Sequence, residues 1–423
     1  MRKNKYQFQK ARAVALAFCL SALSITACAG KDAQSSSAQS SAESTSDAAE
    51  AASDTAASES AAFDGSAQAD AASKAESASS GAAASSETEA ASETAASSEA
   101  AFKAASVSAD ASVSKNTELF AMDTVMTLTA YGPNAQAGLD AATAEIKRLD
   151  SLFSISSETG DIFRVNRDGK GDLSDDSAAL LSRALDFAKV TGGLFEPTIE
   201  PVMQAWGFTT KNFRVPSDDE LKSLLANVDY TRVSLSGSHV ELPEGVQLDL
   251  GGIAKGFTSA RVMDVFKKAG VTSGIISLGG NVQALGTKPD GSLWRVGIQD
   301  PNNLNDTFAV VEVADEAVIT SGAYQRFFEE NGKTYHHIID PRTGYPSDSG
   351  LTSVSIISKD GTLADALSTS LFIMGADAAA DFWKAHSNEF DTVMMDKDGT
   401  VYVTAGLADR CRITGGKQVS IIQ

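Results

Sequence analysis

Apolar residues recur with two different periods over most of the chain. Alternation around Met122-Asp123-Thr124 predicts a strand pair or a bent strand over residues 117–131. Spacings of three and four residues predict amphipathic helices through residues 139–153 and 180–188, and a third helix with an acid-rich beginning over 216–225. The apolar stripes of the first two helices are most simply explained as parts of a hydrophobic core.

The later part of the chain mixes strand-like and helix-like segments. Strands are predicted at residues 246–250, 274–277, 293–298, 308–313, 317–320 and 352–358, and helices at 257–269, 363–374 and 378–386. Two short strands, 392–395 and 401–404, are predicted to form a hairpin around Asp396-Lys397-Asp398-Gly399. Long helices that gather early and strands that mix in later predict an α+β domain with mixed sheets flanked by helices, not a doubly wound parallel sheet.

The N-terminus has the pattern of an export signal. Five basic side chains within the first twelve residues precede an uncharged run over 13–27, which is short for a membrane span. The run ends in Ile25-Thr26-Ala27-Cys28, which is similar to a bacterial lipobox. We therefore expect residues 1–28 to be a lipoprotein signal peptide, with an ordinary signal peptide as the alternative. The protein would then be exported and held through lipid on Cys28 at the extracytoplasmic face of the bacterial cell membrane.

Residues 29–115 consist almost wholly of Ala, Ser, Glu, Asp and Thr. Because there is no apolar stripe to bury, we expect this segment to be a disordered tether. It holds fourteen acids and four lysines, and so contributes half of the formal net charge of −20. The acidic balance argues against nucleic-acid binding, and the three cysteines (Cys19, Cys28 and Cys411) exclude a disulfide framework. Residues 116–423 remain for the folded part.

The run Asp249-Leu250-Gly251-Gly252-Ile253-Ala254-Lys255-Gly256 lies between a predicted strand and a predicted helix. Unpaired backbone N–H groups at a helix N-terminus bind anions, and glycines let the anion come close. The order Lys255-Gly256-Phe257-Thr258 does not fit a P-loop, and the glycine spacing does not fit a dinucleotide fingerprint. A phosphate site and a tight turn whose glycines serve only packing are the two interpretations.

Two further segments carry groups suited to catalysis. His336 and His337 adjoin an aspartate-proline turn, and a neutral imidazole can take a proton from a hydroxyl group near neutral pH. In a strand the two rings face opposite sides, so we expect one of them to enter a site. Asp365 and Thr369 lie four residues apart on a predicted helix and offer hard oxygen ligands suited to Mg²⁺, although such pairs are more often solvated or capping.

From about Leu119 to the C-terminus the chain resembles the FAD:protein FMN transferases, the ApbE-type flavin transferases. The most specific matches are DLGGIAKG at 249–256, HIIDPRTGYP at 337–346 and ADALSTSLFIMG at 364–375. Weaker matches are MDTVM at 122–126, FEPTIEPVMQAWGF at 195–208, SLGGN at 277–281 and SGAYQRFF at 321–328. The resemblance implies an ApbE-like, T-fold-related architecture. It also implies a Mg²⁺-dependent enzyme that releases AMP from FAD and passes FMN to a threonine or serine of an exported acceptor protein with a Ser-Gly-Ala-Thr-like segment.

The resemblance also implies roles for individual residues. Contacts to FAD are expected from Met122, Leu194, Phe195, Glu196, Trp206, Asp249, Lys255, Gly279, Gly280 and His337. Metal ligands are expected to be Asp365, Thr369 and a main-chain carbonyl, that of Gly252 or alternatively Ala254. His337 is the candidate base that deprotonates the acceptor hydroxyl, with Asp340 beside it.

Two positions depart from the family pattern. Glu196 stands where the family commonly has aspartate, which leaves the contacts at that position open. The segment 320–324 resembles the acceptor sequence itself but has Tyr324 at the modified position, so we interpret it as part of the site and not as a self-flavinylation target. Hydrolysis of FAD to FMN and AMP, or flavin binding without turnover, are the alternative functions. A pure binding protein has no need of the metal pair or of a poised histidine.

Overall fold

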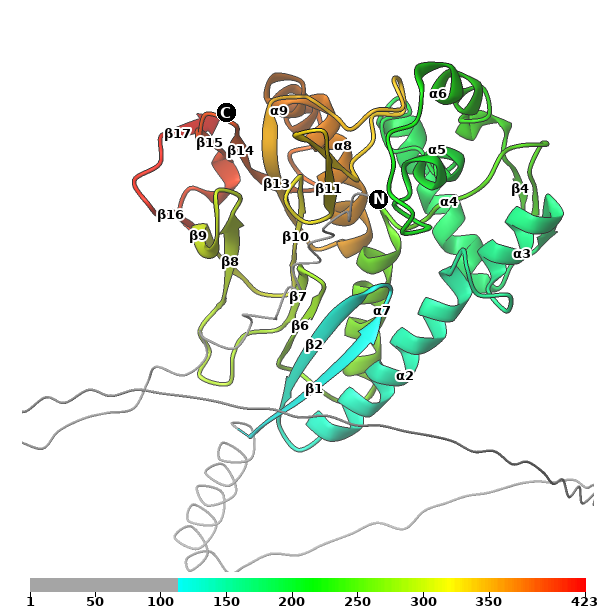
Figure 1. Ribbon diagram of the computed structural model, residues 1–423. Coiled ribbons are helices and arrows are strands. Elements are labelled where there is room, and N and C mark those ends of the chain that lie inside the picture. Colours follow the sequence, from blue (N-terminus) through cyan, green and yellow to red (C-terminus); the bar gives the residue numbers. More distant parts are fainter. Residues whose placement is uncertain (1–112) are drawn as a thin grey trace, which may run out of the picture. The chain divides into compact units, whose positions relative to one another are not determined.

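The computed structural model describes residues 113–423 (Figure 1). The predicted signal peptide, Cys28 and nearly all of the predicted tether lie outside these residues. The first strand begins at Ser114, so regular structure starts two residues before the predicted domain boundary. Along the described part of the chain, no helix is long and apolar enough to cross a membrane. Cys411 is a free thiol.

The described residues form the α+β arrangement that the sequence predicts. The α-helices are α2 (Ala135–Phe153), α3 (Asp161–Asp168), α4 (Asp175–Val190), α5 (Glu200–Trp206), α6 (Asp218–Leu225), α7 (Ala254–Lys268), α8 (Gly361–Met374) and α9 (Ala376–Ala385). Ser174 and Ser217 accept hydrogen bonds from the first turns of α4 and α6, which explains why these helices begin where they do.

A nine-stranded mixed sheet has the order β1-β2-β6-β7-β10-β13-β14-β15-β17. Its strands are β1 (Ser114–Ala121), β2 (Thr124–Tyr131), β6 (Gly274–Leu278), β7 (Asn281–Leu285), β10 (Ala317–Gly322), β13 (Leu351–Ser358), β14 (Asp391–Asp396), β15 (Val401–Thr404) and β17 (Val419–Ile422). Neighbouring strands are antiparallel except β15 and β17, which are parallel.

Three smaller sheets complete the fold. They have the orders β16-β9-β8, β3-β5-β4 and β11-β12. Their strands are β3 (Lys170–Asp172), β4 (Ser234–Ser236), β5 (His239–Glu241), β8 (Trp294–Asp300), β9 (Asn303–Val313), β11 (Phe327–Glu330), β12 (Lys333–His336) and β16 (Cys411–Ile413). β11 and β12 form a hairpin that carries His336 to its C-terminal end.

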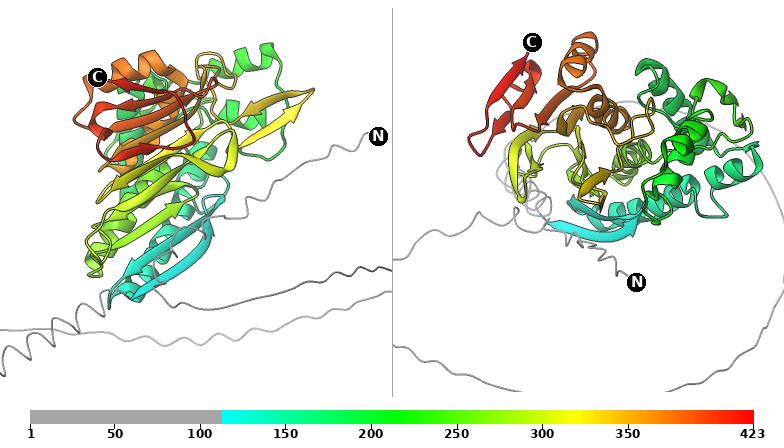
Figure 2. Two further views of the ribbon diagram at one scale, coloured as in Figure 1. Left: turned by 90° about the vertical axis from the view of Figure 1, so that its left-hand side faces the viewer. Right: turned by 45° about the horizontal axis from the view of Figure 1, so that its top comes forward.

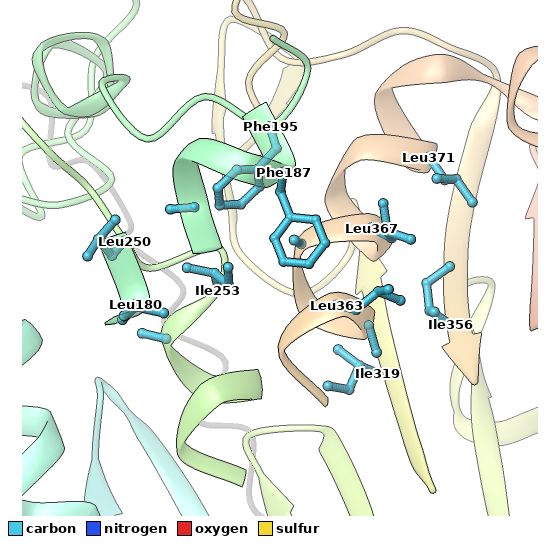
Figure 3. Packing of buried hydrophobic residues seen from close by; sticks show 14 of the residues in the cluster. Leu180, Phe187, Phe195, Leu250, Ile253, Ile319, Ile356, Leu363, Leu367 and Leu371 are labelled. Carbon is cyan, nitrogen blue, oxygen red and sulfur yellow. The ribbon is translucent and has the colours of Figure 1, made fainter. Parts of the chain in front are cut away.

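The large sheet is covered differently on its two faces (Figure 2). Helices α2, α7 and α8 pack on one face, and the β8–β9–β16 sheet packs on the other. Alternation along β13 shows this directly, because Ile356 lies in the cluster with α8 whereas Ile357 lies in the cluster with β8 and β9. The helical side also holds the segment 249–256: Figure 3 shows Phe187 and Phe195 between Leu250 and Ile253 of that segment and the leucines of α8.

One predicted strand, at residues 246–250, is wrong. The segment is extended and buried, but it forms only an isolated bridge between Gln247 and Ile199. Its other backbone hydrogen bonds go to the side chain of Asn166 and to local loop and helix-start groups, among them the carbonyl of Pro197. The helix predicted at 257–269 begins three residues earlier, at Ala254, within the glycine motif itself.

Candidate functional site

Two tight hairpin turns lie next to each other at one end of the large sheet. The β1–β2 turn consists of Met122 and Asp123, both with positive φ (47° and 61°), and the β6–β7 turn consists of Gly279 and Gly280. A Cβ on Gly279 would lie 2.4 Å from Oγ1 of Thr124, so only glycine lets the two turns approach this closely. Positive φ at Met122 and Asp123 is the geometry of a two-residue hairpin turn, and it is unfavourable for residues other than glycine.

The last glycine of the motif allows helices α7 and α8 to cross in close contact. A Cβ on Gly256 would lie 2.2 Å from the carbonyl oxygen of Gly361 and 2.6 Å from Cβ of Asp365. The crossing lets the N–H of Gly256 donate to Oδ2 of Asp365 over 2.8 Å. The start of α7 is therefore aimed at a carboxylate of α8.

The backbone of the motif is less open to an anion than its sequence suggests. The N–H groups of Gly251, Ile253, Ala254 and Gly256 already donate to protein acceptors. A phosphate cradle made mainly of helix-start amides is therefore not what the structure shows. An anion at this motif would depend chiefly on the side chain of Lys255.

Asp365 is a buried carboxylate without an ion-pair partner among the described residues. It is 4% exposed, and its Oδ1 accepts a hydrogen bond from Nδ2 of Asn281 over 2.9 Å. Burial raises the pKa of Asp365, while the nearby charge of Lys255 acts in the opposite direction. A buried carboxylate held only by neutral N–H groups is suited to a hard divalent cation.

Serine hydroxyl groups lie near Thr369, the second predicted metal ligand. Thr369 lies one helical turn after Asp365 and is half-buried. Its Oγ1 is 3.2 Å from Oγ of Ser321, which is also 2.8 Å from Oγ of Ser368. Within residues 113–423 no group of three or more His, Cys, Asp and Glu side chains is arranged to hold a metal. A metal here would therefore combine one carboxylate with hydroxyl and main-chain oxygens, which fits Mg²⁺ better than zinc.

Lys255 connects the charged groups of the site. Its Nζ is 3.5 Å from the carbonyl oxygen of Gly251, and its charge favours the ionised forms of Asp249 and Asp365. Asp249 is half-buried and accepts a hydrogen bond from the N–H of Gly251 over 2.7 Å. Burial raises the pKa of Asp249, and Lys255 together with Arg326 opposes this rise.

His337 is held as a neutral imidazole. Its Nδ1 lies 3.2 Å from the carbonyl oxygen of Arg326, which only a protonated Nδ1 can satisfy. Nε2 is therefore the atom left to accept a proton. Burial lowers the pKa of His337 to about 3, and the charges of Arg326 and Lys255 add to the effect.

The neighbouring His336 is hydrogen-bonded on both ring nitrogens within the fold. Nε2 of His336 lies 3.1 Å from the carbonyl oxygen of Ser347, and its Nδ1 accepts from the N–H of Ile338. The two rings face different partners, since His336 packs against Phe372 and His337 packs against Phe208.

Asp340 does not lie beside His337 in the way the sequence suggests. Its buried carboxylate accepts hydrogen bonds from the backbone and the guanidinium of Arg342, the shortest of them 2.7 Å long. Its N–H donates to the carbonyl of Tyr345. No hydrogen bond between Asp340 and His337 occurs among the described residues, so Asp340 stabilises the turn over 340–345 and does not orient the base.

Trp206, one of the residues expected to contact FAD, lies in the core. It is fully buried, and its Nε1 donates to the carbonyl of Gly344 over 2.7 Å. The ring packs against Tyr335 and Tyr345, with a centroid distance of 5.2 Å to Tyr335. Because no face of the indole is open, Trp206 supports the 340–345 turn from within the core.

Only the apolar residues of the 194–196 segment lie against the glycine motif at 249–256. Phe195 is buried, and its ring is 3.3 Å from the position of a Cβ on Gly252, whereas Leu194 is half-buried. Glu196 accepts hydrogen bonds from Thr198 and from the N–H of Tyr230. Its carboxylate therefore binds its own loop and the start of the 3-10 turn at Tyr230.

Comparison with known proteins identifies the family of the chain. Residues 122–394 match the sequence model of the ApbE family. The chain belongs to the ApbE family. It is similar to the FAD:protein FMN transferase of Treponema pallidum (strain Nichols), with 34% identity over 326 residues, 70% of this chain and 88% of the relative. It is also similar to the FAD:protein FMN transferase of Haemophilus influenzae, with 28% identity over 65% of this chain and 83% of the relative.

Solved ApbE structures share the fold. The ApbE protein of Thermotoga maritima has a TM-score of 0.66 and 30% identity, with 70% of this chain and 98% of that chain covered. The Pseudomonas stutzeri flavinyl transferase ApbE, in its apo form, has a TM-score of 0.61 and 27% identity, with 68% of this chain and 92% of that chain covered.

The candidate site also contains residues that were not singled out from the sequence, although Ser321 lies in the 320–324 segment that was interpreted as part of the site. Asn281 binds Asp365, Ser321 binds Thr369, and Arg326 holds His337 through its carbonyl. All three lie in the weaker matching segments at 277–281 and 321–328, which was the available signal. Glu200 is fully buried and lies in another of the weaker matching segments, 195–208.

Proposed function

We propose that this ApbE protein transfers FMN from FAD to a serine or threonine hydroxyl of an acceptor protein, in a Mg²⁺-dependent reaction that releases AMP. The observation that carries the proposal is the buried carboxylate of Asp365, which the start of α7 binds through the N–H of Gly256, next to Lys255. The charge of Lys255 acts on both Asp365 and His337. The printed function of the curated relatives, FAD:protein FMN transferase, supports the same assignment.

The residues that would hold Mg²⁺ are Asp365, Thr369 and a main-chain carbonyl. Gly252 precedes α7 and its carbonyl accepts no hydrogen bond from the described residues, whereas Ala254 is the first residue of the helix. Both carbonyls remain candidates. Bound between these oxygens, the metal would act as a Lewis acid on the pyrophosphate and stabilise the charge of the leaving group.

The protein side chains supply charge and proton transfer. Lys255 would attract the anionic pyrophosphate. Nε2 of His337 would accept the proton of the acceptor hydroxyl group. The hydroxyl oxygen would at the same time attack the phosphorus of the FMN half. The phosphorus–oxygen bond to AMP then breaks, and AMP carries away the electron pair. The neutral ring that the structure holds is the form that this step requires.

We also propose, from the N-terminal sequence, that the protein is exported and anchored through lipid on Cys28. The acidic segment that follows would let the folded part reach acceptor proteins at the membrane surface. Replacement of Cys28 by serine would test this, because it removes the lipidated thiol. The proposal predicts that the variant moves from the membrane fraction to the soluble fraction, and unchanged membrane association would reject it.

One experiment separates the candidate functions. The full chain is incubated with FAD, Mg²⁺ and an acceptor protein that carries a Ser-Gly-Ala-Thr segment, and with a control acceptor whose threonine is replaced by alanine. Transfer predicts AMP and a mass increase in the first acceptor only. AMP without an acceptor adduct would support hydrolysis of FAD, and the absence of both products would indicate a flavin-binding protein.

A further inference from the structure

Glu200 is a buried carboxyl group to which neither the fold nor the proposed reaction assigns a role. It is the first residue of α5 and is 1% exposed. Its Oε2 has no hydrogen-bond partner among the described residues. An ionised carboxylate in such a place is costly, since neither a cation nor a full set of donors compensates for the lost water.

The fold places Glu200 beside the segment that carries Asp249. The N–H of Asp249 donates to the carbonyl of Pro197 over 2.8 Å, and Ile199 forms a parallel bridge with Gln247. The segment 197–199, which leads directly into α5, and residues 247–249 therefore run side by side. Consistent with this placement, the negative charge of Asp249 disfavours ionisation of Glu200.

The surroundings of the two carboxyl groups are unequal. Asp249 accepts a hydrogen bond from the N–H of Gly251. It also faces the positive charges of Lys255 of α7 and of Arg326, which precedes the β11–β12 hairpin. The polar side chains next to Glu200 are neutral ones, those of Gln204 on its own helix and of Thr209. Burial and the charge of Asp249 raise the pKa of Glu200 to about 8. The negative charge therefore belongs on Asp249 and the proton on Glu200.

We propose that Glu200 and Asp249 form an acid pair that carries a single negative charge, with Glu200 as the proton-bearing member. Glu200 is then a positioning residue for FAD, since it keeps a second negative charge away from the half-buried Asp249. This role in FAD binding rests on the proposed function. Loss of the proton at alkaline pH would add a charge beside Asp249 and weaken the binding of an anionic ligand such as FAD.

Infrared spectroscopy of the ligand-free full chain tests the pair without FAD. At neutral pH we expect a protonated carboxylic-acid band that disappears around pH 8 and is absent from Glu200→Gln. Glu220→Gln is the matched control, because Glu220 pairs with Arg214 at the surface and its pKa is lowered. This variant should keep the band, and a band that survives in Glu200→Gln would overturn the proposal.

Equilibrium binding of FAD with Mg²⁺, measured without acceptor between about pH 6 and about pH 9.5, tests the consequence. Between pH 7 and pH 9 the wild-type Kd is expected to rise up to about tenfold, as the group with a pKa of about 8 loses its proton. Glu200→Gln should show a flat profile over this range. An equal rise in both proteins would reject the role in FAD binding. Binding that follows the expected profile without any transfer to an acceptor would reject the proposed function and leave the acid pair intact.

Discussion

Replacement of Gly256 by alanine tests whether the site depends on the close crossing of α7 and α8. The new Cβ would lie 2.2 Å from a backbone carbonyl and 2.6 Å from a Cβ atom, distances far below any normal contact. Neither atom belongs to the end of a flexible side chain, so no rotamer change can relieve the clash. The two helices would have to move apart, and the hydrogen bond from the N–H of Gly256 to Asp365 would lengthen with them.

The magnitude follows from three contributions. Overpacking in a core costs about 1–3 kcal/mol. Loss of a hydrogen bond to a charged group costs about 1.5–3 kcal/mol. Alanine gains about 1 kcal/mol over glycine within a helix. We therefore expect Gly256→Ala to lower the free energy of unfolding by about 1.5–5 kcal/mol. A folded part of this size should lose about 1–2 °C of Tm per kcal/mol.

Denaturant unfolding of the full chain, followed with FMN transfer in parallel, measures this change. Gly171→Ala is the matched control, since its Cβ would lie 3.5 Å from Cγ2 of Val165, an ordinary contact, at a site remote from α7. The control should remain within about 0.5 kcal/mol of the wild type. A Gly256→Ala variant that matches the control in both stability and transfer would refute the argument that this crossing builds the site.

The remaining predictions concern single side chains. Asp365→Asn should abolish Mg²⁺-dependent AMP release, because the proposed metal site loses its only charged ligand, and activity at the wild-type level would remove that site. Thr369→Val should raise the Mg²⁺ concentration needed for half-maximal activity in a metal titration. His337→Ala should slow transfer by about 10²- to 10⁴-fold. With a pKa of about 3, His337 should limit the wild-type rate only below about pH 4 in a pH profile. For Glu200, a folded-state pKa of about 8, above the unfolded value, means that stability is lost as pH rises from about 4.5 to 8. In the wild type this loss should amount to up to about 4 kcal/mol of the free energy of unfolding between pH 5 and pH 8, and it should be absent from Glu200→Gln.

Periodic segments of the fold could be predicted from the sequence, whereas short or aperiodic segments could not. The β1–β2 hairpin and helices α2, α4, α7 and α8 follow from alternation, helical spacing and turn residues. The β11–β12 hairpin and α5 are short and lack a clear period, so they were missed. The alternating Val246 and Leu248 predicted a strand wrongly, because these residues are buried by neighbouring loops and helices and not by a strand ladder.

The site divides along similar lines. That Asp365 and Thr369 share a helix face, and that His336 and His337 face different sides, could be predicted because both depend on local spacing. The choice of His337 over His336 came from the family resemblance. The partners of these residues could not, since Asn281 binds Asp365 across 84 residues of sequence. Trp206 was misplaced for the same reason, as its partner, the carbonyl of Gly344, is 138 residues away.

The central claim is that the site moves FMN from FAD onto an acceptor protein. The most direct measurement is the ratio of AMP released to FMN bound covalently to an acceptor with a Ser-Gly-Ala-Thr segment, determined by mass spectrometry with and without Mg²⁺. The account predicts one acceptor adduct for each AMP, only when Mg²⁺ is present, and neither product from Asp365→Asn. AMP in excess without an adduct, or an adduct formed equally well without Mg²⁺, would contradict it.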